Sequence, residues 1–283
     1  MQKKKIIQLG MFALMTGVVL AGCGSKTEIQ KEESVKTSTN QKEQDKKKEI
    51  KKEENSDKME AEKAAGTVLD FVFKGKSSGL NNVIGISGTD MTRIAEDTIY
   101  DSKIKDYPGN GWSFQIDGSI YTAEDIFRQY SKVYVKGFKQ IDHYQITDVD
   151  VEGDTATIKV KLDPIAMNSV ANAITWTRAN VYGSLDASKM IGESQNTDIK
   201  AINNLLTFKI YDIIYGDKGV PMELYGEDIE IELALEKDGD KFKTDTDAVL
   251  DIMKQAQINE YSKIESKESQ EKLLDDKMDG TEL

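Results

Sequence analysis

The chain has 283 residues, with 38 Lys and Arg against 50 Asp and Glu, which gives a formal net charge of −12 at pH 7. A surface that follows nucleic-acid phosphates needs clustered basic residues, and the few arginines here are scattered, so no nucleic-acid partner is expected. The single cysteine excludes a disulfide within the chain, and about 200 residues between two polar ends are enough for one stable core.

The first 23 residues have the layout of an export signal. Three lysines, Lys3 to Lys5, precede an apolar stretch from Ile6 to Val19, which is shorter than the roughly 20 residues that a membrane-spanning helix needs. The following residues resemble the lipobox of bacterial lipoprotein precursors: Leu20, Ala21, Gly22 and Cys23. The resemblance implies that residues 1–22 are removed and that acyl chains such as palmitate on Cys23 anchor the protein to the lipid bilayer. The alternative is an uncleaved N-terminal anchor, which also leaves the domain outside the cytoplasm.

After Cys23 the chain is predicted to form a charged tether. Residues 24–60 hold ten lysines and ten acidic side chains without an aromatic residue or a proline, too little apolar surface to offset the entropy of ordering. The sequence therefore predicts a disordered spacer up to residue 60, one folded domain at 61–258, and a charged tail at 259–283. A spacer that can reach into a cell wall favours a Gram-positive host, with the protein on the outer face of the cell membrane.

Helical periodicity dominates the first half of the domain. Apolar residues recur on one face at helical spacing, which predicts helices over three stretches: 58–74, 89–105 and 122–139. Thr122, with Asp125 three residues later, forms a box-like cap for the third of them. Between the second and third helices a glycine-rich break is followed by a short predicted strand at 112–116.

From Tyr144 onward apolar and polar residues alternate, as they do in half-buried strands. Two hairpins are predicted, with turns at Gly153-Asp154 and Asp238-Gly239: residues 144–152 with 155–162, and residues 229–235 with a return through Phe242. A helical insert is predicted between them at about 165–182 and 199–216, with Asp163 as the cap in front of Pro164. A closing helix is predicted at 248–253.

Helices first and antiparallel strands later predict an α+β domain, with N-terminal helices packed on a cone-like antiparallel sheet and a helical insert between two hairpins. The segment from Trp112 through Leu162, with Phe114 to Gly118 and the Gly153-Asp154 turn, resembles an uncharacterised domain family of Gram-positive lipoproteins. The ending from Leu233 to Phe242 resembles the last hairpin of nuclear-transport-factor-two-like, or cystatin-like, cone-shaped domains, although many of these carry Trp where Phe242 stands. The resemblance implies a fold, but no activity and no functional residues.

One acidic segment has part of a cation-binding pattern. Asp148, Asp150 and Glu152 alternate before Gly153 as in a calcium loop, but Lys159 stands at the twelfth position, where a bidentate glutamate belongs. The same alternation suits the solvated face of a strand, and this is the preferred interpretation. No metal and no cofactor are therefore expected.

A cone-shaped fold encloses an apolar pocket between its sheet and its helices. The residues expected to line such a pocket are Trp112, Tyr130, Tyr134, His143 and Trp176. The aromatic residues suit an ordinary core equally well, and His143 suits a surface position. An enzyme would need a buried carboxyl facing a tyrosine, and Asp142 near Tyr144 is the pairing that the sequence offers.

These features favour a non-catalytic binding or interaction module of the cell envelope, anchored outside the cytoplasm, with an envelope protein or a small apolar ligand as its partner. An isomerase or hydrolase-type enzyme with a pocket carboxylate is the main alternative. A solute-binding protein is disfavoured because the chain lacks repeated βαβ patterning. The last alternative is the precursor of a signalling peptide cut from the leader, for which Met15 to Gly22 is the apolar candidate.

Overall fold

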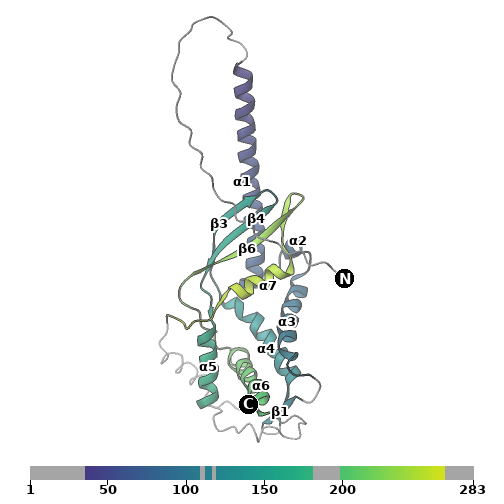
Figure 1. Cartoon of the computed structure of the whole chain (residues 1–283), viewed down its shortest axis with the longest axis vertical. Helices are drawn as coiled ribbons and strands as arrows, with labels where there is room; N and C mark the ends of the chain where they lie inside the picture. The colour runs from purple at the N-terminus through teal and green to yellow at the C-terminus, as the bar shows by residue number, and fades with distance from the viewer. Residues whose placement is uncertain (1–35, 109–111, 117–118, 181–197, 265–283) are drawn as a thin grey trace, which may run out of the picture. The chain divides into compact units, whose positions relative to one another are not determined.

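The computed structural model describes residues 36–108, 112–116, 119–180 and 198–264, with the backbone alone for residues 36–54 (Figure 1). The chain divides into two compact units, Met1–Lys48 and Glu49–Leu283, and the packed core belongs to the second. The predicted lipobox, Leu20 to Cys23, and the candidate signalling peptide lie outside the described residues.

The second unit is an α+β domain, as predicted. Its described helices are α1 (Lys36–Lys74), which begins in the first unit, α2 (Leu80–Ile84), α3 (Gly88–Ile104), α4 (Ala123–Gly137), the 3₁₀ turn η1 (Phe138–Gln140), α5 (Met167–Asn180), α6 (Ile199–Tyr211), the π-helical η2 (Asp212–Asp217) and α7 (Thr246–Gln255). Its described strands are β1 (Ser113–Ile116), β2 (Ser119–Thr122), β3 (Tyr144–Glu152), β4 (Thr155–Leu162), β5 (Ile165–Ala166), β6 (Ile229–Asp238), β7 (Lys241–Lys243) and β8 (Gln257–Ile258). The larger sheet lies at one end of the domain and α5 and α6 at the other (Figure 1).

Helix α1 corrects the prediction of a disordered spacer for residues 36–60, because it begins at Lys36 and is continuous to Lys74. Lysine, glutamate and glutamine are good helix formers, and this stretch contains no proline, which favours a continuous helix. Its C-terminal part buries the face that the periodicity predicted: Ala61, Ala64, Ala65, Val68, Leu69 and Val72.

Strands β3, β4, β6 and β7 form one antiparallel sheet in that order, so both predicted hairpins are confirmed. Gly153 and Gly239 adopt positive φ angles of 61° and 66° in the two turns, a conformation that side chains other than glycine rarely adopt. Along β4, Ile158, Val160 and Leu162 are buried on the inner face, while the residues between them face outward. The helical insert lies between β4 and β6, as predicted.

The free edge of β6 is covered by a side chain from α7. Gln255 Nε2 donates to the carbonyl oxygen of Glu232 at 3.0 Å, and the amide of Glu232 donates to Gln255 Oε1 at 2.9 Å. This amide side chain pairs with the backbone as a neighbouring strand would, which satisfies polar groups that an open edge leaves unpaired.

Helix α4 begins as the sequence predicted. The Thr122 Oγ1 accepts from the amide of Asp125 at 3.1 Å, and the apolar face buries Ile126, Phe127 and Tyr130. α4 packs against α3 on one side and α6 on the other, so its two lateral faces meet different helices.

The start of the insert differs from the prediction. Pro164 precedes the short strand β5 rather than the first turn of a helix, and α5 begins at Met167. Asp163 does not cap α5: its Oδ1 accepts from the amide of Gly226 at 2.7 Å and so fixes a distant loop.

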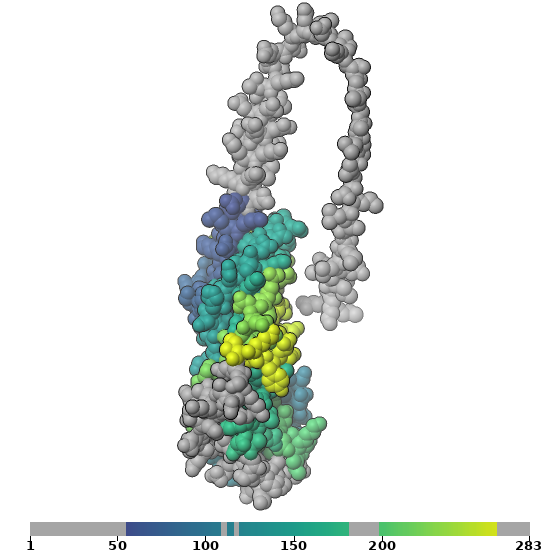
Figure 2. All heavy atoms as spheres, turned by 90° about the vertical axis from the view of Figure 1, so that its left-hand side faces the viewer, coloured from purple at the N-terminus to yellow at the C-terminus, as the bar shows by residue number. Residues whose placement is uncertain are grey.

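The described packing continues past residue 258, which was the predicted end of the domain. β8 pairs in parallel with β5, and the Tyr225 hydroxyl donates to the Glu260 carboxylate at 2.8 Å. The amide of Ser262 donates to Ser169 Oγ at 2.8 Å. Figure 2 shows the last described residues, in yellow, lying against the body of the domain.

Candidate functional site: a lysine-rimmed cleft

The structure places the five predicted pocket residues in different surroundings. Tyr130 is buried in a cluster of aromatic rings, and Tyr134 accepts a hydrogen bond from Gln257 Nε2 at 2.6 Å. Trp176 packs partly buried against the core, and His143 is exposed at the surface. Trp112 lines a hollow in the described part of the domain.

The hollow beside Trp112 is a shallow space of about 650 Å³. The indole ring meets the Tyr107 ring edge-on, with centroids 5.3 Å apart, and the Tyr107 hydroxyl accepts from Asn204 Nδ2 at 2.6 Å. Arg178 and Asn203 on its wall hydrogen-bond to each other. Several of its polar groups are therefore already engaged within the protein.

The predicted pairing of Asp142 with Tyr144 is not formed. Asp142 is exposed, and the Tyr144 hydroxyl instead donates to Asp70 Oδ1 at 2.8 Å. Two lysines complete the group, with Lys74 Nζ 2.8 Å from Asp70 Oδ1 and Lys76 Nζ 3.1 Å from Asp70 Oδ2. This cluster joins the end of α1 to the start of β3, which is a structural role.

Partial burial opposes ionisation of Asp70, but hydrogen bonds from Lys74, Tyr144 and Lys76 outweigh it and lower the pKa of Asp70 to about 2. Burial, together with the hydrogen bond to Asp70, raises the pKa of the Tyr144 hydroxyl. Because the folded pKa of Asp70 lies below its ordinary value of 3.8, the carboxylate stabilises the fold above about pH 4, and this stability is lost as the pH falls toward 2.

We expect Tyr144→Phe to cost about 1 kcal/mol of unfolding free energy at neutral pH, and less as the pH falls from about 5 to about 2. The reason is that the variant loses a hydrogen bond to the charged form of Asp70, which no longer matters once the carboxylate is protonated. Denaturant unfolding of both proteins across this range measures the difference. Tyr261→Phe, which changes an exposed ring, is the control and should show no pH-dependent difference from the wild type.

The acidic residues of the calcium-like segment lie on the outer face of β3, where Asp148, Asp150 and Glu152 are exposed. Lys159 of β4 pairs with Asp148 in the strand register and lies 3.6 Å from a carboxylate oxygen of Glu230. The lysine at the twelfth position of the calcium-loop pattern therefore lies beside the carboxylates of this face.

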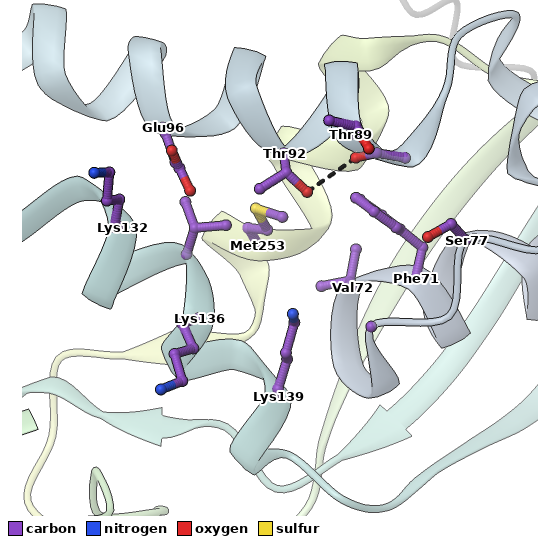
Figure 3. Close-up of a pocket in the computed structure, with 13 residues that line it drawn as sticks. Phe71, Val72, Ser77, Thr89, Thr92, Glu96, Lys132, Lys136, Lys139 and Met253 are labelled. Atoms are coloured by element: carbon purple, nitrogen blue, oxygen red, sulfur yellow. Dashed lines mark hydrogen bonds between the residues drawn. The ribbon is translucent and has the colours of Figure 1, made fainter. Parts of the chain in front are cut away.

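A cleft that was not predicted opens between four helices and contains the stronger candidate site (Figure 3). It has a volume of about 400 Å³. Apolar residues from α1, α4 and α7 form its floor: Phe71, Val72, Val135 and Met253. Hydroxyl and charged groups surround this floor: Ser77, Thr89, Thr92, Glu96, Lys132, Lys136 and Lys139.

Three lysines give the cleft a basic rim within an acidic protein. Lys132 and Lys136 come from α4 and Lys139 from the 3₁₀ turn that follows it, and all three are exposed. Within the part of the chain that the structure describes, neither Lys136 nor Lys139 has a carboxylate within 4.0 Å. In the view of Figure 3, Lys139 points into the space between Val72 and Met253.

Glu96 enters the cleft from α3, facing the lysine side. Burial raises the pKa of this half-buried carboxyl, and the neighbouring Asp97 adds to the effect, while Lys132 and Arg128 oppose it. The carboxyl therefore takes up a proton more readily than an exposed glutamate.

Two glycines let the walls of the cleft approach one another. At Gly75, where φ is +65°, a Cβ would lie 3.0 Å from Lys139 Cε, so the lysine stem packs directly over the backbone. At Gly88 a Cβ would lie 2.7 Å from Ser77 Cβ, so a larger residue there would push the two segments apart. The Thr92 hydroxyl donates to the Gly88 carbonyl at 2.9 Å, which orders the first turn of α3 (Figure 3).

Sequence reasoning missed this site because it followed the apolar stripe of α4 and not the opposite face. The spacing of Lys132, Lys136 and Lys139, at i, i+4 and i+7, places the three on one side of a helix. The lysine spacing can be read from the sequence. The apolar floor from α1 and α7 cannot, because the floor depends on how distant helices pack.

Among the described residues no group of three or more His, Cys, Asp or Glu is arranged to hold a metal ion. In the same part of the chain, no helix combines the length and the apolar character needed to cross a bilayer.

No family model matches the chain, and no curated protein matches it. Among solved structures the chain is similar to a candidate lipoprotein of Bacillus subtilis, with 13% sequence identity, a TM-score of 0.47, and coverage of 70% of this chain. The chain spans 56% of the length of that protein. The predicted lipoprotein domain family and the nuclear-transport-factor-two-like fold remain predictions.

Proposed function

We propose that the protein is a membrane-anchored lipoprotein outside the cytoplasm whose domain binds a ligand, without transforming it, in the lysine-rimmed cleft. The observation that carries the binding role is that two lysines lie beside an apolar floor in one cleft. Among the described residues, neither Lys136 nor Lys139 has a carboxylate partner. Concave sites with an apolar lining and a few convergent polar groups are typical of small-molecule binding.

The anchoring half of the proposal rests on the leader and on the lipobox-like residues Leu20 to Cys23. Two acyl chains on one cysteine are enough for stable attachment to a bilayer, and the long segment that follows would separate the domain from the membrane. Metabolic labelling with a fatty-acid probe should mark the parent protein and leave Cys23→Ala unmarked. Equal labelling of the two forms, or a parent protein that fractionates with the cytosol, would refute the anchoring.

The binding half can be tested with a thermal-shift screen of anionic, neutral and cationic small molecules on the full mature chain. We expect anionic compounds to raise the melting temperature, and the double variant Lys136→Gln/Lys139→Gln to lose the response. The control is Lys161→Gln/Lys241→Gln, which removes the same charge from two exposed lysines of the sheet that do not line the cleft. If no compound distinguishes the wild type from the cleft variant, the cleft is not the binding site.

A second candidate function is hydrolysis with Glu96 as the general acid. The observation that favours it is the raised pKa of a carboxyl that faces a cleft, a combination found at catalytic sites. A hydrolase would lose turnover in Glu96→Gln while still binding its substrate. Turnover of ester or phosphodiester substrates that is unchanged in Glu96→Gln would exclude this role.

A further inference from the structure

We infer that the ligand of this cleft is an organic phosphate, with its anionic head between Lys136 and Lys139 and its apolar part on the floor formed by Phe71, Val135 and Met253. The inference rests on the proposed binding function and adds the chemical class of the ligand.

The sign of the charge follows from the contrast between the cleft and the rest of the protein. The whole chain carries a net charge of −12, yet three lysines and one glutamate are the charged residues that line this cleft. The charge of Lys132 acts on the Glu96 carboxylate, so Lys136 and Lys139 are the two lysines available for an external anion. Lys136 also lies in the last turn of α4, where a cation stabilises the helix dipole, but that role does not require an apolar cleft beside it.

The residue types favour phosphate over carboxylate. The planar fork of arginine recognises a carboxylate or a phosphate from one direction, and no arginine is among the described residues that line the cleft. Lysine ammonium groups act as point charges, which suit a phosphate whose charge is spread over oxygens in several directions. The hydroxyls of Ser77 and Thr89 lie on the opposite wall and can donate hydrogen bonds to further oxygens. Thr89 is also in the first turn of α3, the positive end of that helix dipole.

The size of the cleft limits the apolar part of the ligand. Its volume of about 400 Å³ is near the lower end of the roughly 300–1,000 Å³ seen for small-molecule pockets. Its floor residues are almost fully buried, so they offer a shallow contact rather than a deep channel. A phosphodiester with short alkyl groups fits these limits. An anionic phospholipid also fits if its phosphate and the glycerol carbons beside it enter the cleft while its acyl chains stay in the bilayer.

Glu96 adds a pH dependence to this binding. The groups that act on it are Asp97 of its own helix and Lys132 and Arg128 of α4. When Glu96 is ionised it repels a bound phosphate, and when it is protonated it can donate a hydrogen bond. A phosphodiester keeps one negative charge while Glu96 takes up its proton. Tighter binding at lower pH would therefore report protonation of the protein.

The test is calorimetric titration of the full mature chain, with Cys23→Ser to keep it free of acyl chains, against dibutyl phosphate, hexanoate and inorganic phosphate. We expect dibutyl phosphate to bind at least about tenfold more tightly than hexanoate, and Lys136→Gln/Lys139→Gln to weaken it at least about tenfold. The control Lys161→Gln/Lys241→Gln should stay within about twofold of the wild type. Lowering the pH from about 7.5 toward 4.5, the ordinary pKa of a glutamate, should tighten binding in the wild type and leave it unchanged in Glu96→Gln.

Flotation with phosphatidylglycerol vesicles, against vesicles of phosphatidylcholine alone, distinguishes a lipid head group from a free organic phosphate. Binding to either source that depends on Lys136 and Lys139 supports the inference. Dibutyl phosphate binding that the double variant retains would overturn it, as would binding of hexanoate as tight as that of dibutyl phosphate. In the second case an anion-binding cleft would survive and only the ligand class would be wrong. A wild type that binds none of the anions would overturn the proposed function as well.

Discussion

Replacing Lys209 by methionine is expected to lower the free energy of unfolding by about 3–5 kcal/mol. Lys209 Nζ lies 2.9 Å from Asp212 Oδ2, and the two side chains are 16% and 7% exposed. Methionine keeps most of the volume of lysine but removes its charge, so the Asp212 carboxylate would remain buried without its cation. The penalty comes from that unpaired charge more than from the lost attraction. Urea unfolding of the two proteins measures the difference. The slope of the unfolding free energy against urea concentration should be the same in both.

The local geometry gives Asp212 little freedom to move toward water. It is the first residue of the π-helical turn η2, and a Cβ at Gly216 would lie 2.8 Å from its Oδ1. Lys209 is held on the other side, with its ammonium 5.4 Å from the centre of the Tyr121 ring. The pair therefore links α6 to the β1–β2 hairpin, and both partners are confined.

Two controls separate burial from charge. Lys63→Met breaks an i,i+3 pair of the same type with Glu60, but that lysine is 79% exposed, so we expect a loss of less than about 0.5 kcal/mol. Asp212→Asn combined with Lys209→Met should recover part of the lost stability, because a neutral amide costs less to bury than a carboxylate. If Lys209→Met proves as mild as Lys63→Met, the carboxylate has access to water after all.

The elements that sequence periodicity predicted are those whose pattern repeats over several turns or residue pairs. Helices α3, α4 and α7 and the two hairpins around Gly153 and Gly239 follow directly from apolar spacing. The five-residue α2 and the two-residue strands β5 and β8 carry no such repeat, since their hydrogen bonds are made to partners far away in the sequence. Elements with a long apolar repeat could therefore be predicted from the sequence, and short elements without a repeat could not.

Polar residues were harder to assign than apolar ones, because a polar side chain can have either a local or a distant partner. Asp163 has the sequence context of a helix cap, yet its partner is the amide of Gly226, 63 positions later. Tyr144 was paired with a neighbour in sequence, whereas it bonds to Asp70 on α1. The lysine-rimmed cleft was missed for the same reason, since no local pattern shows which helices will meet.

Truncating Phe127 to alanine is the other change with a large expected effect, a loss of about 3–5 kcal/mol of unfolding free energy. Phe127 is 0% exposed, and its ring lies 5.1 Å from that of Tyr107 and 5.0 Å from that of Phe208, measured between centroids. Phe127 therefore joins α4 to α6 and to Tyr107, which follows α3. Alanine would leave a cavity, and these separate elements cannot all move inward to close it.

Graded variants test this account of Phe127. Phe127→Leu keeps part of the volume and should lose clearly less stability than Phe127→Ala, because the cost grows with the size of the cavity. Tyr261→Ala removes an aromatic ring that is 61% exposed and should change stability by less than about 0.5 kcal/mol. Since Phe127 does not line the lysine-rimmed cleft, binding of dibutyl phosphate by folded Phe127→Leu should equal that of the wild type. A Phe127→Ala protein as stable as Phe127→Leu would mean that α4 and α6 repack around the site, and that the aromatic cluster does not hold them in one arrangement.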